Sequence, residues 1–317
     1  MHWKKLGKIF DPARHVLPGR CSGFAQSPQA LVFDDRVRIY FSSREREPGG
    51  MYISHVVWVD FDKSFSRVLQ IAPEVALPRG ALGCFDEHGI FPLNPLRHDG
   101  RILAYTTGWS RRVSVSVETG IGLSESHDGG ATFQRVGDGP VLSASLREPC
   151  LVGDGFVLVH DGVFHMWYIF GTGWKRYAPD APPDRTYKIG YATSIDGLYW
   201  RKDEARAIVA DRLGEDESQA LPSVLRIGKR WHMVFCYRQS FDFRDNSARS
   251  YRLGHAWSDD LSHWVRDDQG LGIDVSAEGW DSEMMCYPHL FECNGETYLL
   301  YNGNAFGRDG FGLALLE

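Results

Sequence analysis

The stretch PSVLRIGKRWHMVF, residues 222–235, holds the pattern that decides the fold. It contains a short apolar segment after Pro222, a polar turn at Gly228-Lys229, and a second apolar segment that reaches Phe235. Apolar segments on either side of a glycine-containing turn are typical of a β-hairpin. The stretch therefore predicts two antiparallel strands joined by a tight turn.

The same pattern occurs five times, at near-equal intervals along the chain. Each copy starts at an anchor residue and places an aromatic residue thirteen positions later. The anchors are Pro28, Pro92, Gly155, Pro222 and Pro288, and the aromatics are Phe41, Tyr105, Tyr168, Phe235 and Tyr301. Self-similarity at a fixed period is the signature of a repeat architecture. Five modules of about 65 residues account for nearly all of the 317 residues.

A second hairpin follows the first in several modules. Residues 188–194 lead through Asp196-Gly197 to Trp200, and similar runs end at Phe133 and Trp264. These runs predict outer hairpins whose aromatic residue packs between sheets. We interpret the Asp-Gly turns as structural rather than as binding sites.

The two ends of the chain complete the repeat. Residues 310–315 look like the third strand of a module that then stops, and residues 3–10 can supply its fourth strand. Such a pairing closes a ring and removes an exposed sheet edge. The sequence therefore predicts one all-β domain over residues 1–317, a five-bladed β-propeller with four-stranded antiparallel blades, in which the N-terminal strand completes the last blade.

Composition narrows the classes of partner. The formal net charge of −6 leaves no basic footprint for nucleic acid. No apolar run approaches the roughly 20 residues that cross a bilayer, and the first residues lack a secretory signal. Six cysteines without a CxxC pair favour reduced thiols, so we expect a cytoplasmic protein. We also expect no required cofactor and no catalytic metal. A structural divalent cation on the channel axis and the oligomeric state are left open.

In a propeller, the segment leading into the first strand of each blade opens onto one face of the central channel. These lead-in segments are acidic in four of the five blades, whereas the first, Cys21 to Ser27, carries no acid. We expect carboxylates from the four acidic segments to face the channel mouth. The candidate catalytic residues are Asp86, Glu148, Glu217, Asp281 and Glu283.

The residues that follow the repeated aromatics should open onto the same face. They are cations, amides and aromatics, which suit a ligand with hydroxyl groups and apolar C–H faces, such as a sugar. The alternative is that acids and arginines only neutralise one another around the pore. The candidate substrate-binding residues are Gln26, Arg44, His88, Trp109, Arg111, Trp174, Arg238, Tyr287, Asn302 and Asn304.

With its repeat, its Ser-x-Asp-Gly turns and its acidic lead-in segments, the chain resembles the five-bladed glycosidase superfamily, which includes glycoside hydrolase families 43, 32, 117 and 130. The phrases Thr107-Gly108-Trp109, Gly279 to Met284 and Tyr301 to Asn304 are similar to those of bacterial proteins of the family 32 and 43 type. The resemblance implies a glycosidase that cleaves a small or terminal glycan with two or three carboxylates at the mouth. One carboxylate would protonate the leaving oxygen and another would supply or activate the nucleophile.

The chain departs from the family pattern at the first blade, where the usual carboxylate is absent. The catalytic pair could lie elsewhere in the ring, or His88 could act as the acid, as the resemblance to family 117 implies. Phosphate could be the nucleophile, as in family 130, with Arg44, Arg111 and Arg238 binding the anion. A sugar-binding propeller without catalytic activity is the alternative from another functional class.

Overall fold

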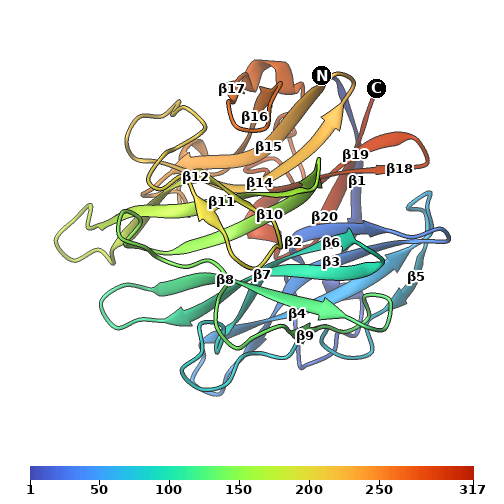
Figure 1. Ribbon diagram of the computed structural model, residues 1–317, viewed down its shortest axis with the longest axis horizontal. Coiled ribbons are helices and arrows are strands. Elements are labelled where there is room, and N and C mark those ends of the chain that lie inside the picture. The colour runs from blue at the N-terminus through green and yellow to red at the C-terminus, as the bar shows by residue number, and fades with distance from the viewer.

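The hairpin repeat read from the sequence forms five units of four antiparallel strands in the computed structural model, which describes residues 1–317 (Figure 1). Unit 1 contains β2 (Gln26–Val32), β3 (Val37–Arg46), β4 (Tyr52–Phe61) and β5 (Val68–Ile71). Unit 2 contains β6 (Gly89–His98), β7 (Arg101–Arg111), β8 (Val117–Ser126) and β9 (Gln134–Arg135). Unit 3 contains β10 (Val152–His160), β11 (Val163–Lys175), β12 (Asp184–Ser194) and β13 (Arg201–Lys202).

Unit 4 contains β14 (Glu217–Ile227), β15 (Arg230–Gln239), β16 (Arg252–Ser258) and β17 (Val265–Arg266). Unit 5 contains β18 (Cys286–Cys293), β19 (Glu296–Asn302), β20 (Phe311–Leu316) and β1 (Trp3–Phe10). Units 1 and 2 share one sheet through a single parallel bridge between Ser54 and Gly89. The helical content is limited to short 3-10 turns: η1 (Pro12–Arg14), η2 (Ser247–Arg249), η3 (Asp268–Leu271) and η4 (Asn304–Gly307). The chain is therefore all-β, as the sequence predicts.

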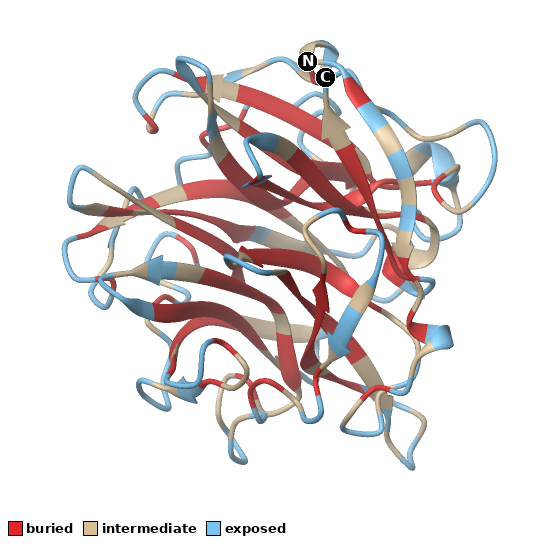
Figure 2. Ribbon diagram, turned by 90° about the vertical axis from the view of Figure 1, so that its right-hand side faces the viewer, coloured by how far each residue is buried: buried red, intermediate tan, exposed pale blue.

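The N-terminal strand belongs to the last unit. Strand β1 pairs antiparallel with β20, from Trp3 opposite Leu316 to Phe10 opposite Phe311. Both ribbon views accordingly place the two termini side by side (Figures 1 and 2). The predicted pairing of residues 3–10 with the C-terminal strand is confirmed, and it covers an edge of β20 that would otherwise be exposed.

The first strands of the units touch one another in order. Contacts join β2 to β6, β6 to β10, β10 to β14, β14 to β18, and β18 back to β2. Each first strand also has a break in register at its anchor, for example between Ala220 and Ser223 of β14. These breaks are β-bulges, which bend a strand and redirect its side chains.

The repeated aromatic residues form the core. Phe41, Tyr105, Tyr168, Phe235 and Tyr301 are all at most 2% exposed. Figure 2 shows the buried residues along the strands and the exposed ones in the connecting loops. Truncation of a buried aromatic side chain of this kind typically costs about 3–5 kcal/mol.

The Ser-x-Asp turns of the outer hairpins hold their own backbone. Asp128 accepts hydrogen bonds from the amides of Ala131 and Thr132 at 2.9 Å, and Asp196 and Asp260 bind their own loops in the same way. This geometry supports the structural interpretation of these turns. The structure contains no helix with the length and apolar character that a bilayer crossing requires.

Candidate functional site

Four of the five predicted catalytic carboxylates lie inside the protein. Asp86, Glu148 and Glu217 are 0% exposed and Asp281 is 2% exposed. Each forms an ion pair with a cation on the outermost strand of its own unit. The pairs are Asp86 with Arg135 of β9, Glu148 with Lys202 of β13, Glu217 with Arg266 of β17, and Asp281 with Lys5 of β1.

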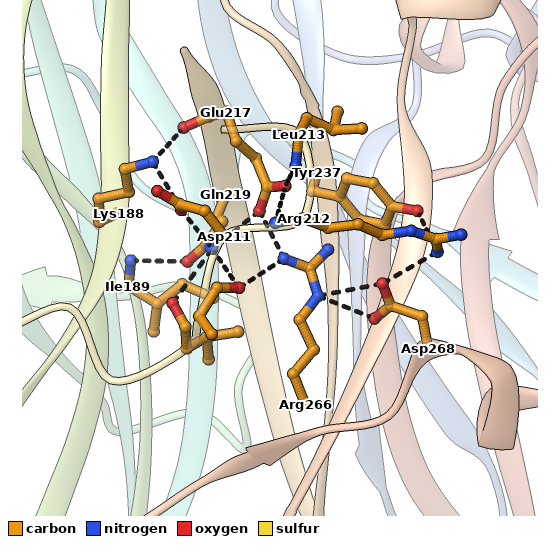
Figure 3. Close-up of polar contacts among 12 residues, drawn as sticks. Lys188, Ile189, Asp211, Arg212, Leu213, Glu217, Gln219, Tyr237, Arg266 and Asp268 are labelled. Carbon is orange, nitrogen blue, oxygen red and sulfur yellow. Dashed lines mark hydrogen bonds and ion pairs between the residues drawn. The ribbon is translucent and has the colours of Figure 1, made fainter. Parts of the chain in front are cut away.

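Glu217 shows how completely such a carboxylate is occupied (Figure 3). One oxygen accepts from Arg266 at 2.6 Å and from the Gln219 amide at 2.9 Å. The other oxygen accepts from the backbone amides of Arg212 and Leu213, both at 2.8 Å. Burial lowers the pKa of Arg266, but its hydrogen bonds to Asp268 and Glu217 outweigh burial and leave this pKa raised.

Glu148 and Asp281 are held in a similar manner. Glu148 accepts from Lys202 at 2.7 Å, from the Tyr168 hydroxyl at 2.9 Å and from the Ala205 amide at 3.0 Å. Asp281 accepts from Lys5 at 2.7 Å and from the Tyr301 hydroxyl at 3.2 Å. The sequence predicts these carboxylates at an open channel mouth, whereas the structure buries each one between the first and outermost strands of its unit.

The fifth predicted carboxylate, Glu283, is exposed, but its loop is held by Asn304. The Asn304 side chain accepts from the Glu283 amide at 2.8 Å and donates to the carbonyl of Gly279 at 3.0 Å. Asn302 is fully buried, donates to the carbonyls of Ala25 and Gly310, and accepts from the Ser27 amide. Both predicted asparagines therefore use their side chains to hold backbone.

Asp86 differs from the other three buried acids because one of its oxygens is unpartnered. Oδ2 accepts from Arg135 Nε at 2.9 Å, whereas the buried Oδ1 has no hydrogen-bond partner. Oδ1 lies against Gly80, where an added Cβ would come within 1.9 Å of it. A glycine is therefore required at position 80 by the space that this carboxylate occupies.

We expect the replacement of Gly80 by alanine to destabilise the protein by about 1–3 kcal/mol, as other overpacking substitutions do. Asp86 cannot move away from the new methyl group without loosening its contact with Arg135. Urea unfolding would measure the change, and Gly137→Ala is the control because no atom lies within 4 Å of its added Cβ. Equal stability of the two variants would contradict this prediction.

A second group of predicted residues does come together, where the first strands begin. Arg44, at the end of β3, donates through Nε to Gln26 Oε1 at 2.9 Å. Gln26 in turn donates to the carbonyl of Phe306 at 2.6 Å. Tyr287 of β18 lies near Arg44. Gln26, Arg44 and Tyr287 thus form one part of a polar group at the starts of the first strands, which we call the mouth.

Arg238 of β15 lies in the adjoining part. Its guanidinium carbon is 3.6 Å from the centre of the Phe243 ring, and its Nη2 donates to the Tyr187 hydroxyl at 3.0 Å. The Tyr187 hydroxyl also bonds to that of Tyr251 at 2.7 Å, and the Tyr251 ring is 5.7 Å from the Tyr287 ring. Sequence reasoning missed Tyr187 and Tyr251, because both lie outside the lead-in and post-aromatic positions that it compared.

Neither arginine of this mouth has a carboxylate partner. Arg238 is 1% exposed, its Nη1 and Nη2 bond to neutral oxygens, and its buried Nε has no partner. Arg44 bonds only to the neutral Gln26, and burial lowers the pKa of its guanidinium. Buried charges in proteins are normally paired, so the buried Arg238 and the half-buried Arg44 are unusual in having no carboxylate partner.

Asp154 is the acid beside this cluster. It occupies the position before the anchor in β10 and has a left-handed φ of 52°. Leu221 in β14 and Tyr287 in β18 occupy the equivalent positions and also have left-handed backbones. Asp154 Oδ2 accepts from the Leu221 amide at 3.3 Å, and its Oδ1 has no hydrogen bond within the protein. Burial raises the pKa of Asp154 to about 7, although Leu221 and Arg185 act to lower it. Its charge also acts on the thiol of Cys236, two residues before Arg238.

The remaining predicted residues lie outside this group. Trp109 of β7 donates to Ser54 at 2.7 Å, and its ring stacks on His88 at 5.7 Å. Arg111 forms an ion pair with Glu47 at 2.7 Å. Trp174 of β11 is half-buried against the core of units 3 and 4. Across the whole chain, no group of three or more His, Cys, Asp or Glu side chains is placed to hold a metal ion.

Comparison with known proteins agrees with this fold. No protein-family model matches the chain. Two Mycobacterium tuberculosis proteins, MT1551 of strain CDC 1551 / Oshkosh and Rv1502 of strain ATCC 25618 / H37Rv, are each 34% identical over 319 residues, across the full length of both chains; both are described as uncharacterized proteins. A β-1,2-mannobiose phosphorylase from Thermoanaerobacter sp. strain X514 is 26% identical over 137 residues, which are 41% of this chain and 43% of that protein.

Solved structures share the architecture at low sequence identity. A glycoside hydrolase aligns over 99% of this chain and 92% of its own, with a TM-score of 0.73 and 16% identity. A complex of BT0996 with RGII aligns over 98% of this chain and 91% of its own, with a TM-score of 0.71 and 17% identity. A thermostable family 43 glycoside hydrolase aligns over 94% and 89%, with a TM-score of 0.66 and 12% identity. The predicted resemblance to family 43 and 32 type glycosidase propellers is confirmed at the level of the fold.

Proposed function

The chain belongs to the family of the mycobacterial proteins MT1551 and Rv1502, and we propose that it is a carbohydrate-active enzyme that cleaves a glycosidic bond with inorganic phosphate. The observation that carries the proposal is one protonatable acid, Asp154, in the same mouth as two guanidiniums without a carboxylate partner, those of the buried Arg238 and the half-buried Arg44. We further propose that the five units form the five blades of one propeller domain, with this mouth at one end of its channel.

The buried ion pairs favour phosphorolysis over hydrolysis. A glycoside hydrolase of the usual kind needs two carboxylates at the bond, one as acid and one as base or nucleophile. Asp86, Glu148, Glu217 and Asp281 are each occupied by a cation within their own unit. We assign these four acids to stabilising each unit internally, which leaves Asp154 as the acid of the mouth.

Phosphate supplies the nucleophile that a second carboxylate would otherwise provide or activate. The Arg44 guanidinium, whose terminal nitrogens have no acceptor in the protein, would bind the phosphate oxygens by charge-assisted hydrogen bonds. The unpaired charge of Arg238, in the adjoining part of the mouth, would favour the same anion. The partial match to a mannobiose phosphorylase supports this assignment.

The reaction then needs one proton transfer. Asp154, with its pKa near 7, is partly protonated at neutral pH and can give its proton to the glycosidic oxygen. The bond between the anomeric carbon and that oxygen breaks while a phosphate oxygen bonds to the same carbon. The products are a sugar 1-phosphate and the shortened glycan, and in the reverse direction the Asp154 carboxylate takes the proton back.

Phosphorus NMR of reactions with β-1,2-mannobiose, xylobiose and sucrose, each with and without phosphate, tests the proposal. We expect a sugar 1-phosphate signal with at least one of these sugars. We also expect Arg44→Gln to raise the KM for phosphate at least tenfold, whereas Arg46→Gln, an exposed neighbour on the same strand, should not. Hydrolysis without phosphate would overturn the proposal, and so would binding without turnover across the three sugars.

A further inference from the structure

A separate cavity of about 290 Å³ lies beside the mouth, between units 1 and 2. It is lined by Glu47, Arg79, Gly80, Leu82, Glu87 and His88. Its volume is close to the lower end of the roughly 300–1,000 Å³ that is typical of small-molecule sites. We propose that this cavity binds a neutral sugar unit of the glycan, at a distance from the bond that is cleaved; the inference rests on the proposed carbohydrate function.

The balance of charges in this cavity differs from that in the mouth. Its walls carry two carboxylates, Glu47 and Glu87, against Arg79 on the rim and Arg111, which forms an ion pair with Glu47 behind it. These charges balance, so the cavity has no excess of cations that would select an anion. Balanced donors and acceptors suit the hydroxyl groups of a neutral sugar, each of which can donate and accept a hydrogen bond.

His88 is held in place and still has unused hydrogen-bonding capacity. His88 Nδ1 faces the Arg111 amide at 3.4 Å and the Glu87 carboxylate at 3.3 Å, and its ring stacks on Trp109. Its Nε2 has no hydrogen-bond partner in the protein. Burial lowers the pKa of His88, and the charge of Arg111 adds to this effect, so the ring is neutral at physiological pH.

The floor and rim of the cavity complete the fit. Gly80 lines the cavity, and directly behind it lies the unpartnered, fully buried Oδ1 of Asp86. Leu82 is 98% exposed and lines the rim of the cavity. A sugar provides an apolar C–H face for Leu82 and hydroxyl groups for the polar walls.

Tyr52 connects the cavity with the mouth. Its ring lies 5.6 Å from the guanidinium carbon of Arg44, and its carbonyl accepts from Arg111 at 2.7 Å. Glu47 follows Arg44 by three residues on the same hairpin. One glycan could therefore reach from the phosphate site at Arg44 across the Tyr52 ring into the cavity.

Saturation-transfer NMR with three neutral trisaccharides, β-1,2-mannotriose, xylotriose and maltotriose, tests the inference. We expect at least one of them to bind the wild-type protein, and Leu82→Arg, which puts a larger, charged side chain at the rim of the cavity, to weaken this binding at least tenfold. Leu146→Arg is the matched control, because Leu146 is 92% exposed on the corresponding segment of unit 3. His88→Ala should weaken binding in the same direction as Leu82→Arg.

The outcomes separate this inference from the proposed function. Failure of all three sugars to bind, or equal binding by the Leu82→Arg and Leu146→Arg variants, would overturn the cavity assignment even if phosphorolysis is observed. Loss of binding in Leu82→Arg together with hydrolysis in the absence of phosphate would support the cavity and refute the phosphorylase.

Discussion

Replacement of Glu217 by glutamine is expected to destabilise the protein by about 3–5 kcal/mol, which is the usual cost of removing one partner of a buried ion pair. The variant leaves the Arg266 guanidinium buried without its counter-ion. It also replaces one carboxylate oxygen by an NH₂ group, which cannot accept the hydrogen bonds of the Arg212 and Leu213 amides or, in the other orientation, that of Gln219. Urea unfolding monitored by tryptophan fluorescence would measure the loss.

Two further variants make this result specific. Asp203→Asn breaks an exposed ion pair with Arg206 and should cost less than about 1 kcal/mol. Adding Arg266→Met to Glu217→Gln removes the unpaired cation and should restore part of the lost stability. A catalytic role predicts a different pattern, in which Glu217→Gln is as stable as the wild type and loses turnover alone.

The sequence repeat predicted the strands well because their pattern is local. The hairpin read from Pro222 to Phe235 matches β14 and β15, with the turn at Gly228-Lys229 between them. The N-terminal strand was predicted at residues 3–10, which are the bounds of β1. Hydrophobic periodicity and turn residues encode this level of structure directly.

The repeat also predicted that the four lead-in acids are equivalent, but it did not predict their burial. Their partners lie on the outermost strands, 49 to 54 residues away for Arg135, Lys202 and Arg266. A signal was present, because each of these cations follows the aromatic of its outer hairpin by two residues. The first unit lacks the lead-in acid, although Arg67 follows Phe65 by two residues, so the break in the repeat marks a missing carboxylate.

Asp154 differs from these four acids because its place directly before the anchor, and not a repeated sequence pattern, sets its environment. The residues immediately before the five anchors are Ser27, Phe91, Asp154, Leu221 and Tyr287. Only one of them is acidic, and the bulge at each anchor sets its direction. Sequence alone does not single out Asp154, because the bulge and the left-handed backbone appear only in the folded chain.

The replacement of Asp154 by asparagine is expected to lower the rate of sugar 1-phosphate formation by about 10²- to 10⁴-fold, the usual contribution of a general acid. The amide keeps the size of the side chain and can still accept from the Leu221 amide, but it cannot transfer a proton. Phosphorus NMR would follow the rate, with Asp161→Asn in an exposed turn as the control. A rate within threefold of the wild type would exclude Asp154 as the acid.

The same substitution should change how stability depends on pH. The pKa of Asp154 is about 7 in the folded protein and close to its ordinary value of 3.8 in the unfolded chain. Between these two values the folded state holds a proton that the unfolded state has released, so the stability due to this group falls as pH rises from about 4 to about 7. The amide of Asp154→Asn does not titrate, so the stability of the variant should lack this decline.

At pH 8 the asparagine variant should therefore be more stable than the wild type, by at most about 4 kcal/mol. Urea unfolding at pH 4.5 and pH 8 would show the two proteins diverging as pH rises. Together with the lost activity, a gain in stability identifies a buried charge that is retained for chemistry, because a carboxylate with a purely structural role would stabilise the fold. Loss of both activity and stability at pH 8 would show that Asp154 is needed to hold β10 against β14 instead.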